Sequence, residues 1–422
     1  MFKYIALAIA VACQFQIRAP VSEVGLMVNL ADPIVAVLVA IAIIRFVSNP
    51  SIASDYRIPL LWAGGLSLVL SIGLIVSLGD AGTWGFLNRY VGWFVLLGYA
   101  GVGVWIVREN AWPAFRTAFV VTAGVIVLVH ALPMLSNAYF LTSFSHELTG
   151  RQFVGFLGNP NAVSFFLLVV VGMVFCWTGQ RRIYVFLILV VIFLGIAYSI
   201  SRSGLVGLGA ILIAALAIKR GALKPALGAL AVCVALVLAP QVILDQSDGL
   251  MRIVKYKMNK EWDSYVGILR GKAPRAAALS YRPSSLQLRF DQTRVALDQW
   301  TDSPVFGIGL GGFKNRYQDP SSDGSAPILH NSALWLLTET GLVGLIAFLA
   351  AFIWIAAALY RQRRSGNDVI PLALLTLVVF AVMSQLHDLF YQRVLWLVIG
   401  LGIGGLAPSG IDHKRVASTA KE

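Results

Sequence analysis

A histidine stands at the start of a long apolar segment that begins near residue 329. Pro327 is favourable in a first helical turn, so Ser325 or Ala326 is the expected cap and His330 follows at the helix N-terminus. The positive end of the helix dipole disfavours imidazolium, and a neutral imidazole can accept a proton as a general base does. Taken alone, His330 is more simply explained as an interfacial histidine with a solvated tip.

Basic residues concentrate upstream of this histidine. Ten basic and three acidic residues lie between Arg252 and Arg294, which gives this stretch a net charge of +7. Arginine offers fixed, paired donors to phosphate, so the patch suits a phosphate-bearing ligand. Attraction to anionic lipid headgroups explains the same charge equally well, and both interpretations stay open.

The segments that must position these residues are strongly apolar. Of 422 residues, 58% are apolar and 13% are charged, and the mean hydropathy is +0.79. A soluble protein has about 25% charged residues, and a disordered chain is poor in aliphatic and aromatic residues. The net charge of +13 is spread between apolar runs, so it does not indicate nucleic-acid binding. The composition indicates a polytopic membrane protein.

The predicted fold is an all-α membrane protein with about twelve transmembrane helices and one long outer loop of short helices. Helices one to nine are expected within 1–241, the loop over 242–328, helices ten to twelve within 329–407, and a tail over 408–422. In the loop, segments 250–270 and 284–302 have helical periodicity. The apolar runs are 3–17, 33–47, 59–78, 89–107, 115–135, 160–178, 183–198, 204–218, 225–241, 329–359, 369–386 and 391–407.

The orientation follows from the lysines and arginines of the short loops. They divide sixteen to five between alternate loops, and the side with sixteen is expected to be cytoplasmic. Both termini and the tail then lie in the cytoplasm. The long loop and His330 lie outside, which for a bacterial inner membrane is the periplasm.

Three motifs, and a fourth weaker one, resemble those of the O-antigen ligases. His330-Asn331, nine residues and then Gly341-Leu-Val-Gly344 is similar to a pattern of that family. The run from Leu288 to Phe313 resembles a signature that these ligases share with O-antigen polymerases. Two shorter segments, 201–204 (SRSG) and more weakly 159–161 (NPN), resemble other recurring motifs of the superfamily.

The resemblance implies a fold like that of GT-C glycosyltransferases, with a periplasmic active site. Such an enzyme takes a glycan from undecaprenyl diphosphate and attaches it to lipid A-core. By position, His330 matches the family's essential histidine, and Arg202 and Arg289 match two arginines associated with activity. We expect the arginines to bind the diphosphate and His330 to act on the acceptor hydroxyl. Further substrate contacts are expected from Asn331, Arg151, Arg282, Arg294 and Gly311.

The expected partners are the lipid-linked glycan donor, the lipid A-core acceptor and membrane lipids, with no nucleic acid. The chain is expected to be a monomer. An O-antigen polymerase or a protein O-oligosaccharyltransferase would differ in its acceptor. A transporter without chemistry is the second alternative, and it predicts charges at mid-membrane, where only Glu339 qualifies.

No cofactor is expected. Glu261 and Asp263 have the E-x-D spacing of some metal-dependent glycosyltransferases, but they lie in a basic segment that repels cations. The resemblance also implies a metal-independent reaction. Residues 307–312 (GIGLGG) fit the dinucleotide pattern G-x-G-x-x-G, but no strand is expected before them. These glycines are expected to allow a tight turn or a close approach of backbone.

Carboxylates near the outer boundary bear on the stereochemistry. A retaining mechanism needs a carboxylate nucleophile, and the short loops offer only Asp80, Glu147 and Asp388, none within the three motifs. An inverting reaction is therefore expected. Glu339 points half a turn away from His330 and is expected to pair with a neighbouring helix. His387, Asp388 and Arg393 either line the cavity or form a boundary ion cluster.

Overall fold

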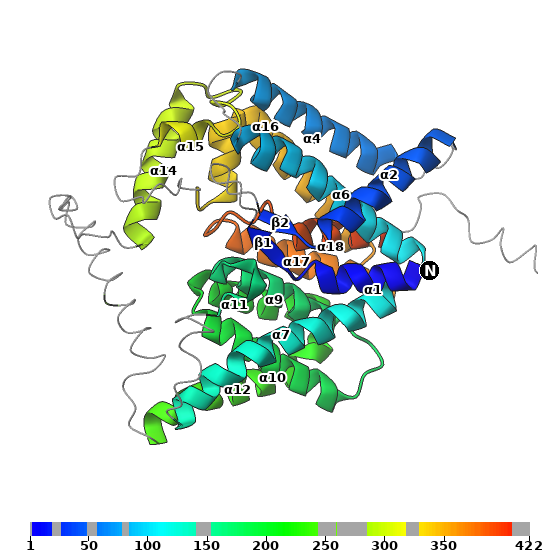
Figure 1. The fold of residues 1–422 in the computed structure, drawn as a ribbon, viewed down its shortest axis with the longest axis vertical. Coiled ribbons are helices and arrows are strands. Elements are labelled where there is room, and N and C mark those ends of the chain that lie inside the picture. Colours follow the sequence, from blue (N-terminus) through cyan, green and yellow to red (C-terminus); the bar gives the residue numbers. More distant parts are fainter. Residues whose placement is uncertain are drawn as a thin grey trace, which may run out of the picture.

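The protein is described by a computed structural model, which is mostly helical (Figure 1). The structure describes residues 2–18, 27–48, 57–77, 84–140, 153–243, 259, 285–317 and 329–406. Each of the twelve apolar runs contains a helix. These helices are α1 (Phe2–Ala12), α2 (Asp32–Ser48), α4 (Arg57–Val76), α6 (Gly92–Arg108), α7 (Trp112–Phe140), α9 (Pro160–Phe175), α10 (Arg182–Ser199), α11 (Arg202–Ile218), α12 (Leu223–Ile243), α16 (Ser332–Arg361), α17 (Val369–Met383) and α18 (Arg393–Gly405).

Six helical segments of the described residues are long and apolar enough to cross a membrane. They are Pro59–Val76, Gly85–Arg108, Trp112–Ala131, Arg182–Ser199, Arg220–Leu238 and Ser332–Arg361. A helix needs about 20 apolar residues to span the hydrocarbon core, and the remaining apolar helices are shorter. Twelve membrane crossings therefore stay a prediction.

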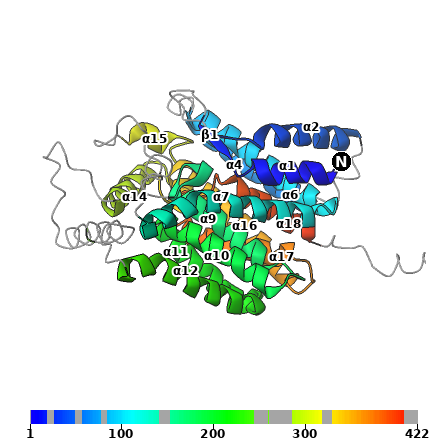
Figure 2. The same cartoon turned by 60° about the horizontal axis from the view of Figure 1, so that its bottom comes forward.

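The smaller elements of the outer loop gather at one end of the helix bundle. Helices α14 (Ser285–Thr301) and α15 (Gly312–Arg316) lie at the end opposite the N-terminus in both views (Figures 1 and 2). Helix α14 confirms the helix expected over 284–302, whereas 250–270 lies outside the described residues except for residue 259. A short antiparallel hairpin, β1 (Gln16–Arg18) and β2 (Met27–Asn29), joins α1 to α2.

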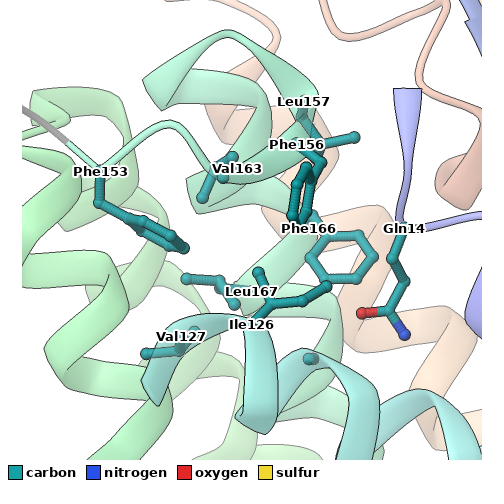
Figure 3. A pocket seen from close by; sticks show the side chains of 11 residues that line it. Gln14, Ile126, Val127, Phe153, Phe156, Leu157, Val163, Phe166 and Leu167 are labelled. Atoms are coloured by element: carbon teal, nitrogen blue, oxygen red, sulfur yellow. The ribbon is translucent and has the colours of Figure 1, made fainter. Parts of the chain in front are cut away.

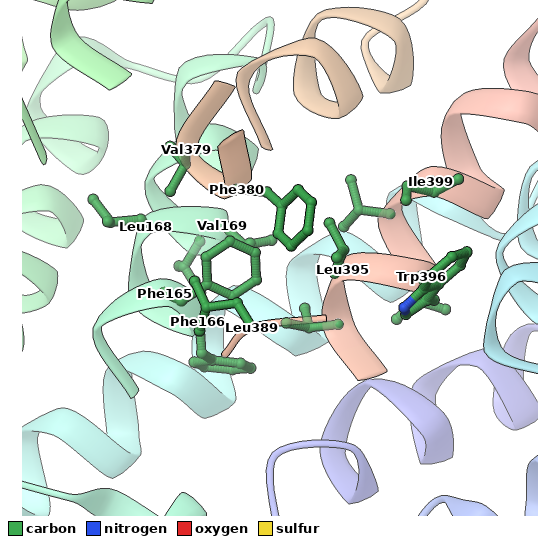
Figure 4. Packing of buried hydrophobic residues seen from close by; sticks show 14 of the residues in the cluster. Phe165, Phe166, Leu168, Val169, Val379, Phe380, Leu389, Leu395, Trp396 and Ile399 are labelled. Atoms are coloured by element: carbon green, nitrogen blue, oxygen red, sulfur yellow. The ribbon is translucent and has the colours of Figure 1, made fainter. Parts of the chain in front are cut away.

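Close packing at the centre depends on small residues and aromatic rings. Helices α6 and α18 pack closely because Gly103 faces Leu397 and Gly400 faces Ala100, where any added Cβ would overlap backbone atoms. Beside them, side chains of α9, α17 and α18 interdigitate around Phe380 (Figure 4). This core joins α9, α17 and α18 into one packed unit.

Helix α16 is broken at Gly341, about a third of the way along its length. Gly341 has φ 67° and ψ −167°, which interrupts the helical hydrogen bonds on either side. The carbonyls of Thr338 and Glu339 instead accept hydrogen bonds from the N–H groups of Ile308 (2.9 Å) and Gly309 (3.1 Å). The N–H groups of Leu342 and Val343 donate to the carbonyls of Pro304 (3.0 Å) and Val305 (3.2 Å). Residues 304–311 therefore form a re-entrant loop that supplies the backbone partners lost at the break.

The glycines of this re-entrant loop allow its backbone to lie very close to α16. Gly307, Gly309 and Gly311 all have positive φ, as expected for a tight turn. A Cβ on Gly307 would lie 2.5 Å from the backbone of Glu339, and a Cβ on Gly309 would overlap Ser77. The element before these glycines is helix α14, whereas the dinucleotide pattern G-x-G-x-x-G follows a strand.

We predict that Gly341→Ala destabilises the protein. The conformational free energy of alanine is about 1–3 kcal/mol less favourable in this backbone conformation, and its Cβ would overlap the carbonyl of Val305. Thermal unfolding in detergent should show a clear drop in Tm. Gly124→Ala is the matched control, because a Cβ there meets no atom within 4 Å. Equal Tm values for the two variants would contradict the role of the break.

Candidate active site

A cavity of about 430 Å³ opens where the ends of several helices meet. Its walls come from the hairpin, the π-helical turn η1 (Gly85–Val91), the start of α9, the segment before α16 and the loop between α17 and α18. Among its lining residues are Gln16, Asp32, Trp84, Arg89, Asn159, His330, His387, Asp388, Tyr391, Gln392 and Arg393. The cavity therefore gathers residues from both ends of the sequence around His330.

A second pocket is much smaller and apolar. It has a volume of about 20 Å³ and lies among Phe153, Val163 and Phe166, with Gln14 at its edge (Figure 3). Such a volume admits about one water molecule. It cannot hold a sugar or a diphosphate, so it is not a candidate for the active site.

Helix α16 starts later than expected. Its cap is Asn331, whose side-chain oxygen accepts a hydrogen bond from the N–H of Leu334 (2.9 Å), so the expectation of a cap at Ser325 or Ala326 is wrong. Asparagine satisfies one of the free donors of the first turn, which allows the helix to begin there. His330 thus precedes the helix and lies at the edge of the cavity.

His330 stacks on His387. Their ring centroids are 5.2 Å apart and the rings are inclined by 22°. Burial and, to a smaller extent, the nearby charge of Arg289 lower the pKa of His330 to about 4, against the opposing charge of Asp388. Burial likewise lowers the pKa of His387 to about 3. Both rings are therefore neutral near pH 7, and each can accept a proton.

Arg89 lines the cavity beside the histidine pair, although no sequence motif marks it. Its guanidinium is buried, with Nη1 3.0 Å from Asp388 and Nε 4.0 Å from Glu339. It also lies over the rings of Trp335 (4.3 Å) and Tyr391 (4.8 Å). The π-helical turn that carries it has no sequence signature; such turns occur frequently at functional sites. The one feature of the sequence that could have indicated Arg89 is Glu339, because an acid within an apolar helix needs a cationic partner.

Arg89 connects the re-entrant loop to the histidine pair. The carboxylate of Glu339 also accepts a hydrogen bond from the N–H of Gly311 (2.8 Å). The ion pair with Arg89, on the helical turn η1, confirms that Glu339 pairs with a neighbouring helix. On the other side of Arg89, Asp388 accepts a hydrogen bond from the hydroxyl of Ser332 (3.2 Å), two residues after His330. Arg89 is therefore a positioning residue that fixes the segments carrying both histidines.

Two of the short motifs bind each other. The hydroxyls of Ser201 (2.7 Å) and Ser203 (2.9 Å) donate to the side-chain oxygen of Asn161. Asn159 caps α9, and Ser201 caps α11. The N-termini of these helices thus lie side by side, close to the cavity that Asn159 lines. Arg202, the first residue of α11, is exposed there.

Of the expected site residues, some lie at the histidine pair, some are described but do not line the cavity, and some lie outside the described residues. Arg289 acts electrostatically on both histidines, so the structure brings it to the site, whereas Arg202 does not line the cavity. Asn331 and Gly311 have hydrogen bonds of their own, to Leu334 and Glu339, and Arg294 is exposed on α14. Arg151 and Arg282 lie outside the described residues.

His387, Asp388 and Arg393 all line the cavity, which settles the alternative left open by the sequence. The three residues are also tied into ion pairs or ring contacts. Asp388 pairs with Arg89, and Arg393 pairs with Asp32 through two hydrogen bonds of 2.7 and 2.8 Å. Asp388 and Arg393 therefore line the cavity and form ion pairs at the same time, whereas His387 takes part through its ring contact with His330.

We predict that Arg89→Met strongly destabilises the protein. The change leaves Asp388 and Glu339 buried without the cation that faces both, which costs about 3–5 kcal/mol. Thermal unfolding in detergent measures the loss. Arg45→Met, an exposed change at the far end of α2, should leave Tm unaltered. Adding Glu339→Gln and Asp388→Asn to Arg89→Met should restore part of the lost stability, and no recovery would count against the electrostatic explanation.

The family relationship agrees with this arrangement. Residues 187–349 match the O-antigen ligase family. The match includes Arg202, Arg289 and His330, the re-entrant loop and the break in α16. Among curated proteins, no sequence matches the chain. Residues 187–349 thus match an O-antigen ligase domain, and this match supports a relationship of the protein to the O-antigen ligase superfamily.

Proposed function

We propose that the protein is an O-antigen ligase. It transfers a glycan from undecaprenyl diphosphate to lipid A-core at the periplasmic face of a bacterial inner membrane. The observation that carries the proposal is a neutral His330 in a cavity at one end of a helical bundle, with the charge of Arg289 beside it. Both residues lie within the segment that matches the O-antigen ligase family.

In the proposed reaction, His330 accepts the proton of the acceptor hydroxyl. The acceptor oxygen forms a bond to the anomeric carbon of the donor glycan while the bond from that carbon to the diphosphate oxygen breaks. The departing diphosphate carries its negative charge away with the lipid, and Arg289 and Arg202 stabilise this charge. Each charge-assisted hydrogen bond contributes about 1.5–3 kcal/mol, so two such bonds favour departure substantially.

We propose an inverting, metal-independent transfer. A retaining reaction needs a carboxylate nucleophile close to the anomeric carbon. Two nearby carboxylates, Asp388 and Glu339, are held by Arg89 and by hydrogen bonds from Ser332 and Gly311. These contacts favour structural roles for both. Asp80, Glu147, Glu261 and Asp263 lie outside the described residues.

The proposed orientation has support from the opposite end of the bundle. There, Arg116 and Lys219 surround Asp368, with nitrogen–oxygen distances of 3.1 and 3.7 Å. Arg181 and Arg182 start α10 at the same end, and Arg361 ends α16. Basic residues of short loops favour the cytoplasmic side, so the cavity faces the periplasm and both termini lie in the cytoplasm.

Reconstitution tests the proposal. The purified protein is supplied with an undecaprenyl-diphosphate-linked glycan and lipid A-core in excess EDTA, and the product is analysed by NMR. The expected product is glycosylated lipid A-core with an inverted anomeric linkage. Elongation of the donor glycan instead of the lipid A-core would identify a polymerase, and transfer to protein would identify an oligosaccharyltransferase. Movement of the donor without a new glycosidic bond would identify a transporter, and a need for added Mg²⁺ or Mn²⁺ would contradict metal independence.

We predict that His330→Ala abolishes transfer while the protein still folds. Loss of a general base typically costs about 10²–10⁴-fold in rate. The measurement is kcat with purified protein, alongside Tm. His130→Ala is the control, because His130 lies on α7 against Phe153 and Phe156 and does not line the cavity. Near-normal ligation by His330→Ala would exclude this residue as the base.

We also predict that Arg289→Gln shifts the pH dependence of kcat/KM. The positive charge of Arg289 lowers the pKa of His330, so its removal raises that pKa from about 4 toward 6.5. His330 accepts a proton only when neutral, so the acid limb of the profile should move to higher pH. Loss of a diphosphate contact would lower the whole profile without moving this limb.

Arg294→Gln is the matched control for this pH shift. Arg294 is exposed on the same helix, and its side chain acts on Asp291. Its profile should keep the acid limb of the wild type. If the acid limbs of Arg289→Gln and Arg294→Gln coincide, Arg289 does not set the pKa of His330.

A further inference from the structure

Among the described residues that line the cavity, the positive and negative charges balance one another. Arg89 lies 3.0 Å from Asp388, and Arg393 lies 2.7 Å from Asp32. The two histidines in the wall are neutral near pH 7. A diphosphate requires an excess of positive charge, which these paired groups do not offer. The cavity therefore suits an uncharged ligand.

Two glutamine side chains add neutral amide groups to the lining of the cavity. The side chains of Gln16 and Gln392 line the cavity, are partly exposed and make no hydrogen bond to any described residue. Gln16 comes from strand β1, and Gln392 precedes α18, where its side chain does not cap the helix. A side-chain amide offers both donors and an acceptor, which matches the hydroxyl groups of a sugar.

The position of His330 indicates which substrate enters. A base must lie within hydrogen-bond reach of the proton that it accepts. Since His330 lines the cavity, the acceptor hydroxyl has to lie inside it. Arg202 and Arg289, proposed to bind the diphosphate, do not line the cavity. Donor and acceptor therefore reach His330 from different sides.

We propose that this cavity is the acceptor subsite, and that Gln16 and Gln392 bind the hydroxyl groups of an uncharged sugar next to His330. The inference rests on the proposed function and adds a sugar class and two specificity-determining residues. A volume of about 430 Å³ lies within the usual range of small-ligand sites, about 300–1,000 Å³. Both glutamines lie outside the 187–349 match, so the hairpin and the start of α18 set acceptor choice separately from the family domain.

Direct binding tests the subsite. The probes are core oligosaccharide released from lipid A-core by mild acid and, separately, undecaprenyl diphosphate. Each is titrated against the full-length protein in detergent by calorimetry. Gln16→Ala and Gln392→Ala should each weaken oligosaccharide binding about threefold to tenfold, the loss expected for one neutral hydrogen bond. Undecaprenyl diphosphate binding should not change. Gln180→Ala, an exposed glutamine at the opposite end, should alter neither.

Several outcomes would overturn the subsite. Unchanged oligosaccharide affinity in both glutamine variants would do so, provided that their Tm values match the wild type. Weaker binding of undecaprenyl diphosphate in these variants would assign the cavity to the donor instead. A tenfold loss of wild-type affinity after dephosphorylation of the oligosaccharide would show that phosphate, and not an uncharged sugar, is recognised. Failure of glycan transfer while the wild type binds the oligosaccharide through both glutamines would overturn the proposed ligase function and leave the subsite intact.

Discussion

The break in α16 is the constraint on which the rest of the outer end depends. No water is available inside a bilayer to satisfy free backbone groups, so a helix broken at Gly341 needs partners from elsewhere in the protein. The re-entrant loop 304–311 provides them on both sides of the break. This fixes the loop against α16 and brings the N–H of Gly311 to Glu339. The position of the outer loop therefore follows from hydrogen bonding as much as from apolar packing.

A series of charged side chains connects this loop to the segment that carries His330, the candidate base. Glu339 and Asp388 face Arg89, and Asp388 binds Ser332 just after His330. Burial of such a network requires that each charge be compensated, which makes the arrangement rigid and sensitive to the loss of one member. The two histidines carry no compensating charge, because burial and the charge of Arg289 together favour the neutral form of both rings.

The spacing of the histidine motif has a structural explanation. Asn331 caps the helix, and the nine residues after it carry the helix to its break at Gly341. Gly344 follows one turn later, where a Cβ would overlap Thr340. The motif thus sets the distance between the cavity and the point where the re-entrant loop crosses the helix. In the same way, the serines of residues 201–204 hold α11 against α9 through Asn161.

Hydropathy in the sequence determined the helical class, the twelve apolar helices and the helix over 284–302. Apolar residues that become buried form runs or recur with a helical period, and both can be counted along the sequence. Its motifs also identified the O-antigen ligase domain and selected His330 and Arg289. Only the tertiary structure decided that Arg89 and His387 belong to the site. It also showed that the helix starts at Asn331 and that a hairpin near residue 16 forms a wall of the cavity. These features depend on contacts between segments about 300 residues apart, and a local pattern of side chains does not encode which distant charge or ring will face it.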